Sequence, residues 1–573
     1  MGPSLERQEV GPAAAGRLSG LERSLPVWVL AAIALAGLMA LPLAWLVVLS
    51  LSGEAGLTFD HYRRVFGDPA LRRAFGSTVL LAFWVGAASV AVGAPLAWLT
   101  ARTDVPGRAL IRGLVMASFV TPPFLGAFAW VMLAGPNAGL LNKLWRGVTG
   151  ADDPLLNIFS LPGLVFVVTM YTFPYVYIMI ANALGLIASD LEEAAAILGG
   201  GRLAVASTVT LPMAMPALAS GFLLAALQAL ALFGSPAILA LPAGFHTITT
   251  QIWALFQFPP KVETAAAFSI PLLLATALLL FAQKKLLGRR GYAAVSGRGG
   301  QRRRIPLGAW RYPALGGCLA VMAGSIFLPY AVLAKAAVSR AWAQPLSWDN
   351  LTFANFSFTL FEYSSTRAAI VNTLELGVMT AVVGAGLAAL LSYVVSRRLV
   401  VGHQVLAFLA LAPVVVPGVV LAVGLFIAYT RPPFFLYGTL AILFVAYLTK
   451  EMPAGYAQSD ATFRGISSEL EDAGRILGAG RLRVLADITA PLAKSGIIAA
   501  WCFIFIGVIR ELSASIILFT PSTKVMSVVI FDLKEEGQFG AIAVLGLIML
   551  GLTFATVLLA QAALGRDLLG ARE

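Results

Sequence analysis

Few residues of this chain have the types and spacing that chemistry requires. The 573 residues include only three histidines and two cysteines. Cys318 and Cys502 both lie in apolar runs, so neither a disulfide framework nor a cluster of metal ligands is available. No credible nucleophile stands beside a base in these runs, and no G-x-x-x-x-G-K-[ST] phosphate loop is present. We therefore expect no catalytic residues, no metal site and no cofactor bound by this chain.

Two adjacent charges interrupt a long apolar run. A charge within a membrane span costs about 2.5–3.5 kcal/mol unless it is paired or hydrated. Arg510 and Glu511 are therefore candidates to line a pathway or form a gate, although an ion pair that fixes neighbouring helices, or a position with easy access to water, remains an alternative. Gln228 is a further polar candidate. Lys450 and Glu451 are interpreted as a structural pair.

One polar segment occurs twice. Residues 190–212 (DLEEAAAILGGGRLAVASTVTLP) and 469–491 (ELEDAGRILGAGRLRVLADITAP) are identical at 12 of 23 positions and lie 279 positions apart. Both copies lie between long apolar runs. The repetition suggests a site where a molecule outside the membrane contacts both halves of the chain.

Each copy predicts a short helix, a glycine break and a second helix that ends in proline. Serine and glutamate at the start of each copy fit a capping box (Ser189 with Glu192, Ser468 with Glu471). Each helix carries an apolar stripe, at 191, 194, 195 and 198 in the first copy and at 470, 473, 474 and 477 in the second. The stripe centres on small residues, which allow another backbone to approach (Ala194–Ala195 and Ala473–Gly474). Gly199 and Gly478 lie where a positive φ is expected.

Composition places these segments in a polytopic membrane protein. The chain is 59% hydrophobic and 12% charged, whereas soluble proteins carry about 25% charged residues. The apolar runs have the length of membrane-crossing helices and lack the alternation of barrel strands. We therefore predict an all-α fold with about twelve spans: 27–51, 77–100, 114–134, 161–182, 213–238, 264–282, 312–334, 370–395, 405–428, 436–456, 492–518 and 540–562.

The basic residues of the loops predict the orientation. With the N-terminus inside, the inside segments carry 24 lysines and arginines and the outside segments 12. This bias favours a cytoplasmic N-terminus, a cytoplasmic C-terminus and cytoplasmic positions for both repeated segments. The net charge of +12 is explained by this topology, so no nucleic-acid partner is expected.

The predicted spans form two parallel repeats of six. Residues 27–282 form the first repeat and 312–562 the second, joined by a basic cytoplasmic linker at 283–311. Residues 1–26 and 563–573 form cytoplasmic ends. Six spans per repeat leave both repeats in one orientation, related by an axis along the membrane normal.

The repeated segment resembles the EAA signature of permease subunits of binding-protein-dependent ABC importers. The first copy carries Glu193-Ala194-Ala195 and Gly199, followed by Leu211-Pro212. The second copy departs mildly, with Asp472-Ala473-Gly474 and Gly478, and more strongly at Ala490 before Pro491. The resemblance covers nearly the whole chain, as two fused permease domains.

The resemblance implies a function that the residues alone do not give. In that family the helix docks on a cytoplasmic ATPase subunit, which binds ATP and Mg²⁺, and transmits its movement. It implies two copies of the ATPase, a periplasmic substrate-binding protein, a bacterial inner membrane and alternating access. The resemblance assigns ATPase coupling to eight residues: Glu193, Ala194, Ala195, Gly199, Asp472, Ala473, Gly474 and Gly478.

Three further segments indicate a substrate. Residues 510–515 (RELSAS), 528–533 (VVIFDL) and 133–145 (LAGPNAGLLNKLW) resemble permeases of the ferric iron subfamily. Related permeases carry thiamine, polyamines or phosphonates, so these remain alternatives to iron. An ion-coupled secondary transporter is the competing class, with Glu511 as its main candidate carboxylate, but the paired polar segments would then lack a purpose.

Overall fold

The computed structural model is built almost entirely of helices. It describes residues 25–564 apart from 54–55, 187–191, 193, 196, 200, 290–304, 401, 431 and 433. Two strands of two residues each, β1 (Ser52–Gly53) and β2 (Gly56–Leu57), pair antiparallel. Most of the predicted end segments 1–26 and 563–573, and residues 290–304 of the linker, lie outside the described residues.

The first half contains α1 (Leu25–Ser50), α2 (Asp60–Gly67), α3 (Pro69–Arg102), α4 (Arg108–Val120), α5 (Pro123–Ala134), α6 (Leu140–Thr149), α7 (Leu161–Leu186), α9 (Arg202–Val205), α10 (Leu211–Ala231), α11 (Gly234–Leu239), α12 (Ile248–Leu255) and α13 (Val262–Arg289). The five-residue π-helix η2 (Ala206–Thr210) joins α9 to α10.

The second half contains α14 (Arg311–Met322), α15 (Leu328–Ala337), α16 (Ala354–Ser357), α17 (Ser364–Ser396), α18 (His403–Leu411), α19 (Gly418–Tyr429), α20 (Leu440–Arg464), α21 (Ser468–Ile476), α22 (Arg481–Val484), α23 (Ala490–Ile509), α24 (Ser515–Leu518), α25 (Met526–Glu535) and α26 (Phe539–Leu564). Short 3₁₀ or π segments are η3 (Gly308–Trp310), η4 (Ala323–Phe327), η5 (Trp348–Asn350), η6 (Phe358–Glu362), η7 (Ala412–Val415) and η8 (Leu485–Thr489).

The structure confirms a polytopic helical fold and refines its spans. Among the described residues, eight helices are long and apolar enough to cross a membrane, or ten if each of two bent pairs counts as one span. The other two predicted spans correspond to α1 and α20. The described apolar part of α1 is short, Gly37–Ser50, and α20 carries Lys450 and Glu451 near its middle.

The third span of each half is broken rather than continuous. In the first half, α4 and α5 meet at 100°, and in the second half the helix 403–415 and α19 meet at 110°. Both breaks occur at prolines, Pro122–Pro123 and Pro417. Proline lacks an amide donor and pushes the preceding residue out of the helical region. The predicted spans at 114–134 and 405–428 are therefore each a bent pair of helices.

Two other predicted spans end early. α10 ends at Ala231 instead of 238, and α23 ends at Ile509 instead of 518. Each is followed by a short buried helix, α11 or α24. The placement of Arg510 and Glu511 inside a continuous helix was therefore wrong, because both lie in the turn between α23 and α24.

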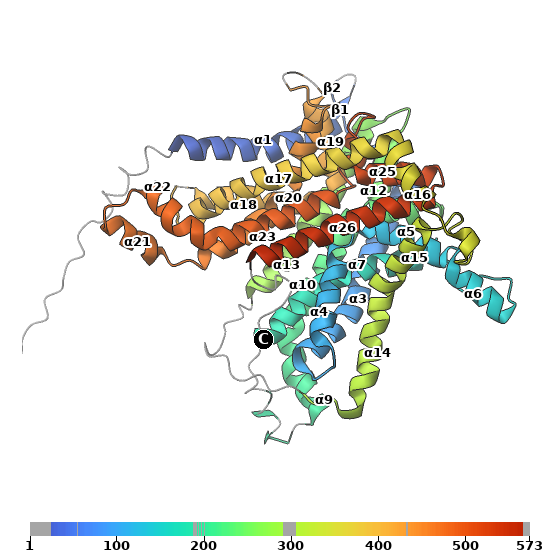
Figure 1. The fold of residues 1–573 in the computed structure, drawn as a ribbon. Helices are drawn as coiled ribbons and strands as arrows, with labels where there is room; N and C mark the ends of the chain where they lie inside the picture. The colour runs from blue at the N-terminus through green and yellow to red at the C-terminus, as the bar shows by residue number, and fades with distance from the viewer. Residues whose placement is uncertain are drawn as a thin grey trace, which may run out of the picture.

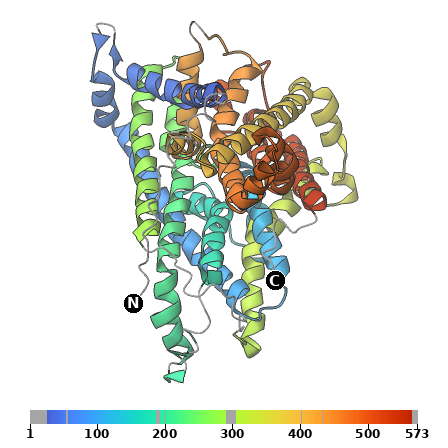
Figure 2. The same ribbon diagram turned by 90° about the vertical axis from the view of Figure 1, so that its left-hand side faces the viewer.

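The two halves form bundles with the same internal packing. In the first half α3, α7 and α10 pack on one another, as do α17, α20 and α23 in the second. The helices of the first bundle run toward α9 and those of the second toward α21 and α22, so the two repeated segments lie at the diverging ends (Figure 1). A view from the side shows the same divergence (Figure 2).

The first span of each half crosses to the other half. α1 packs on α19, and Gly424 of α19 is so close that an added Cβ would lie 2.7 Å from the carbonyl oxygen of Pro42. α15 likewise packs on α5. In the same region, Trp130 Nε1 of α5 donates to the carbonyl of Gly324, 3.1 Å away. Because the first span of each half packs on the other half, the two halves share one core.

Candidate functional site

The second repeated segment folds as a helical hairpin. Ser467 caps α21 by accepting a hydrogen bond from the amide of Glu469, 3.2 Å away. Gly478 (φ +89°) ends this helix, and Gly199 (φ +88°) takes the same conformation in the first copy. Side chains other than glycine are strained at such φ values. The two glycines therefore stop the helices at equivalent places.

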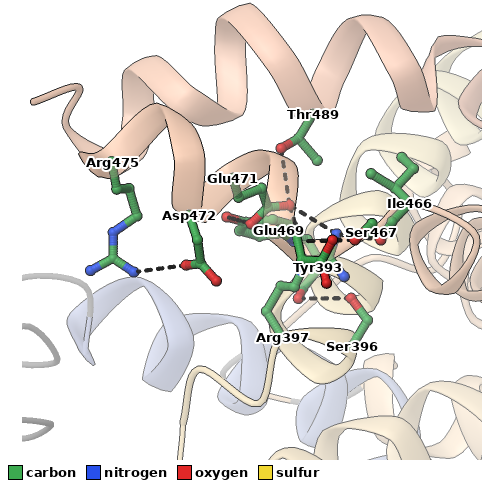
Figure 3. Close-up of polar contacts among 10 residues, drawn as sticks. All are labelled: Tyr393, Ser396, Arg397, Ile466, Ser467, Glu469, Glu471, Asp472, Arg475 and Thr489. Atoms are coloured by element: carbon green, nitrogen blue, oxygen red, sulfur yellow. Dashed lines mark hydrogen bonds and ion pairs between the residues drawn. The ribbon is translucent and has the colours of Figure 1, made fainter. Parts of the chain in front are cut away.

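Glu471 anchors this hairpin to the bundle (Figure 3). The carboxylate is 2.9 Å from the Arg397 guanidinium at the end of α17. It also accepts hydrogen bonds from Tyr393 Oη at 3.3 Å and from Thr489 Oγ1, at the end of η8, at 3.0 Å. Glu471 is only 7% exposed. The predicted capping box of Ser468 with Glu471 was therefore wrong, because Ser467 forms the cap and Glu471 turns inward.

The first copy has the same anchor. Glu192 lies 279 positions before Glu471, accepts a hydrogen bond from Thr210 Oγ1 at 2.7 Å and lies 3.4 Å from the Arg102 guanidinium at the end of α3. Ser189 lies outside the described residues, but Glu192 is engaged with the bundle in the same way as Glu471. A sequence signal for the anchor existed, since each copy has a threonine 18 residues after this glutamate.

The small residues of α21, in the second copy, lie on two different surfaces. Gly474 is buried, and an added Cβ would lie 2.9 Å from Ile488 Cδ1 and 3.2 Å from Val484 Cγ2. This glycine therefore lets α21 pack on α22 and η8 of its own segment. Ala473 faces solvent, as do Asp472 and Gly478.

The most exposed apolar residues of the site form equivalent pairs. Ile197 and Leu198 are 85% and 88% exposed, and Ile476 and Leu477 are again 85% and 88% exposed. Large apolar side chains exposed together mark interaction surfaces. Sequence reasoning included the two leucines in the apolar stripe but missed the isoleucines. Their signal was the identical Ile-Leu-Gly in both copies.

The remaining residues of the first copy give a partial comparison. Ala194 and Gly199 are exposed and Ala195 is half-buried. Glu193 lies outside the described residues. The surfaces that both copies share are therefore an inward glutamate anchor and an outward apolar pair before a glycine.

Glu511 lies in a buried polar cluster where two helix breaks meet. Its carboxylate pairs with the Lys450 ammonium of α20 and accepts a hydrogen bond from the Ala514 amide at 2.8 Å. A Cβ on Gly418, the first residue of α19, would lie 3.2 Å from Glu511 Oε1. Glu511 is 5% exposed. The predicted pairing of Lys450 with Glu451 was wrong, because Lys450 bonds Glu511.

Arg510 points to the other half. Its guanidinium donates to the Phe119 carbonyl at 2.9 Å, next to the break between α4 and α5, and lies 5.9 Å from the Phe119 ring centre. Phe119 packs edge-on against Tyr175, with ring centres 5.0 Å apart. Tyr175 Oη accepts a hydrogen bond from Gln228 at 2.6 Å. The structure thus joins Arg510 and Gln228, and all four residues are half-buried.

Neither cluster resembles a metal centre. In the part of the chain that the structure describes, no group of three or more His, Cys, Asp or Glu side chains could hold a metal ion. The buried polar groups are instead arranged as anchors between helices.

Comparison with known proteins agrees with this architecture. Residues 93–290 and 381–568 each match the family described as binding-protein-dependent transport system inner membrane component. Each match includes one repeated segment and the arginine that pairs with its glutamate, Arg102 or Arg397.

Three curated relatives illustrate the range of this similarity. The ferric transport system permease protein FbpB of Actinobacillus pleuropneumoniae is 25% identical over 88% of this chain and 73% of its own length. The Fe(3+)-transport system permease protein FbpB 2 of Haemophilus influenzae is 23% identical over 91% of this chain and 95% of its own length. The molybdenum transport system permease protein ModB of Escherichia coli is 30% identical over 34% of this chain and 84% of its own length.

These matches decide between the classes that the sequence left open. The family consists of importer components that work with a substrate-binding protein and an ATPase, so the ion-coupled secondary transporter is not supported. Two family domains spanning most of its length show that the chain belongs to the binding-protein-dependent transport system inner membrane components, as a non-catalytic permease subunit of an ABC importer.

Proposed function

We propose that this permease carries ferric iron from a periplasmic binding protein to the cytoplasm by alternating access. The observation that carries the substrate is the similarity to ferric permeases along 81–91% of the chain, in three relatives. The described residues contain no group of three or more His, Cys, Asp or Glu side chains that could hold a metal ion. In this proposal, selection of iron therefore rests on the binding protein, and the permease supplies the pathway.

The repeated segments are the docking sites for two copies of the ATPase. Each presents an exposed apolar pair, Ile197–Leu198 or Ile476–Leu477, beside the predicted coupling residues. The ATPase copies bind ATP and Mg²⁺, and this chain binds no cofactor. Two equivalent sites in one chain support a two-to-one assembly.

The glutamate anchors carry movement into the bundles. Glu471 holds α21 to the end of α17 through Arg397 and to η8 through Thr489. η8 continues directly into α23. A shift of the docked helix therefore reaches two long helices of the second bundle, and Glu192 provides the same connection to α3 and η2.

Arg510 and Gln228 are the pathway or gate residues. They lie at the ends of a row that continues through Phe119 and Tyr175 between the two halves. When the two bundles move relative to each other, the distance between the halves changes. This row of four side chains spans that distance, so it is placed to respond to the movement. Glu511 serves a different role in this proposal, as the structural partner of Lys450.

The orientation proposed for this inner-membrane protein puts both termini and both repeated segments in the cytoplasm. Single cysteines at Ser467 and at Asp349, both exposed, report the two sides. We expect an impermeant thiol reagent to label Asp349→Cys in intact spheroplasts and Ser467→Cys only after lysis. A third cysteine at Ser296, outside the described residues, is expected to behave as Ser467→Cys does. Labelling of all three before lysis contradicts this orientation.

Reconstituted transport tests the substrate. The permease, its ATPase and its binding protein are placed in proteoliposomes, and the binding protein is loaded with radioactive ferric iron. We expect iron to accumulate inside only when ATP is supplied, because the energy comes from the ATPase. Transport of radiolabelled thiamine, a polyamine or a phosphonate, with no uptake of iron, contradicts the proposed substrate while leaving the importer class intact.

A further inference from the structure

α6 is held rigidly although it projects from the bundle (Figure 1). Asn142 is fully buried. Its amide nitrogen donates to the carbonyls of Gly135 at 2.9 Å and Leu156 at 2.7 Å, and its amide oxygen accepts from the Leu156 amide at 2.9 Å. This side chain therefore ties the helix to the turn before it and to the loop after it.

A second side chain on the same helix face completes the attachment. Arg146 follows Asn142 by four residues, which places both on one face. Its guanidinium donates to the carbonyls of Pro136 at 2.6 Å, Asn137 at 3.1 Å and Asp152 at 3.2 Å. Lys143 donates to the carbonyl of Ala343, in the second half, at 2.8 Å.

The opposite face of α6 is apolar and uncovered. Leu144 is 65% exposed, Trp145 36% and Val148 77%. The helix carries Lys143 and Arg146 but no acidic residue. A basic helix with an exposed Leu, Trp and Val face is the pattern of helices that lie in the headgroup region of a bilayer.

Other exposed apolar side chains occur in the segments that lead into long spans. They precede α3 in the first half and α17 in the second, and each is at least 57% exposed: Leu57, Phe59, Phe66, Leu346, Trp348, Phe353 and Phe361. Aromatic residues gather at membrane interfaces in this way. Because α6 joins two membrane segments, α5 and α7, it lies at the end of the spans as well.

We propose that α6 is an interfacial anchor whose Leu144, Trp145 and Val148 lie in the headgroup–acyl boundary of the bilayer. The polar side chains Asn142, Lys143 and Arg146 are all engaged with carbonyls of the chain itself. The exposed face therefore lacks the directed polar rim that a protein partner would use. A bilayer needs no directed contacts, and anionic headgroups are attracted by the two cations.

The anchor fixes one end of the broken span that α4 and α5 form. α6 follows α5 directly through the turn that Asn142 holds. With α6 fixed in the interface, movement between α4 and α5 is confined to the break at Pro122–Pro123. This inference does not depend on the transported substrate or on ATPase docking.

A fluorescent probe tests the position of this face. Cys318 and Cys502, both buried, are replaced by serine, and an NBD label is attached to Val148→Cys in nanodiscs of phosphatidylethanolamine and phosphatidylglycerol. We expect blue-shifted emission that is quenched by lipids brominated on their acyl chains. The matched control is Asp153→Cys, in the exposed loop after α6, whose emission is expected to stay water-like and unquenched.

A second label guards against local disruption. Leu144→Cys, one turn earlier on the same face, is expected to behave as Val148→Cys does. Water-like emission at both positions, with no quenching by brominated lipid, overturns the proposal. So does a blue shift at both positions that appears only when the binding protein is added, because the face would then be a protein contact.

Discussion

Replacing Leu198 and Leu477 together with aspartate is expected to release the ATPase from the permease. Both leucines are 88% exposed, and burying one leucine side chain contributes about 2 kcal/mol. Because each ATPase copy docks on one repeated segment, each copy loses one such contact, which weakens its binding by about 2 kcal/mol, on the order of thirtyfold. Titration of the purified ATPase onto the permease in nanodiscs measures the affinity.

An exposed leucine outside the repeated segments provides the control. Leu346 is 57% exposed, and Leu346→Asp is expected to leave ATPase affinity unchanged. Wild-type affinity in the double variant would show that the exposed pairs do not form the docking surface.

A variant of Glu471 distinguishes docking of the ATPase from transmission of its movement to the bundle. Glu471→Gln leaves Ile476 and Leu477 in place but removes the ion pair with Arg397. We expect ATPase binding to persist while uptake per ATP hydrolysed falls about tenfold, equivalent to about 1.4 kcal/mol of lost coupling. Glu469→Gln, on the exposed surface of the same helix, is the matched control. Equal uptake per ATP in both variants would exclude the anchor from transmission.

Glu511→Gln is expected to lower the stability of the permease. The Lys450 side chain is 26% exposed, and removing the carboxylate charge breaks its ion pair with Glu511. Breaking a buried ion pair costs about 3 kcal/mol, so thermal unfolding in detergent is expected at a clearly lower temperature. Lys450→Met in the same chain should recover part of the loss, because it removes the stranded charge. Glu535→Gln, at a 64% exposed side chain, is the control.

Replacing Arg510, the neighbour of Glu511, is expected to change transport, whereas replacing Glu511 is expected to change stability. Arg510→Gln removes the contact with Phe119 that joins the halves, so uptake per folded complex should fall about tenfold, while Glu511→Gln leaves uptake per folded complex unchanged. Reconstituted transport, normalised to the folded fraction by size-exclusion chromatography, measures this difference. Full uptake in Arg510→Gln would remove it from the pathway.

The sequence determined the class of the protein because the relevant signals are local. Apolar runs of span length predict helices wherever they occur, and the offset of 279 residues predicts two similar bundles. The glycines at 199 and 478 end their helices as expected, since the required positive φ is a property of one residue. The family resemblance likewise rested on a short, repeated motif.

Tertiary structure decided what each polar residue contacts. Glu471 fits a capping box by spacing, yet it bonds Arg397, which lies 74 positions away, because the hairpin folds against the end of α17. Lys450 pairs with Glu511 and not with its neighbour Glu451, because the turn between α23 and α24 brings the Glu511 carboxylate to α20. Proline marked the breaks in sequence, but the bends of 100° and 110° depend on the helices packed around them. The exchange of α1 and α15 between halves has no local signal at all, because packing partners far apart in sequence are selected only when the whole core assembles.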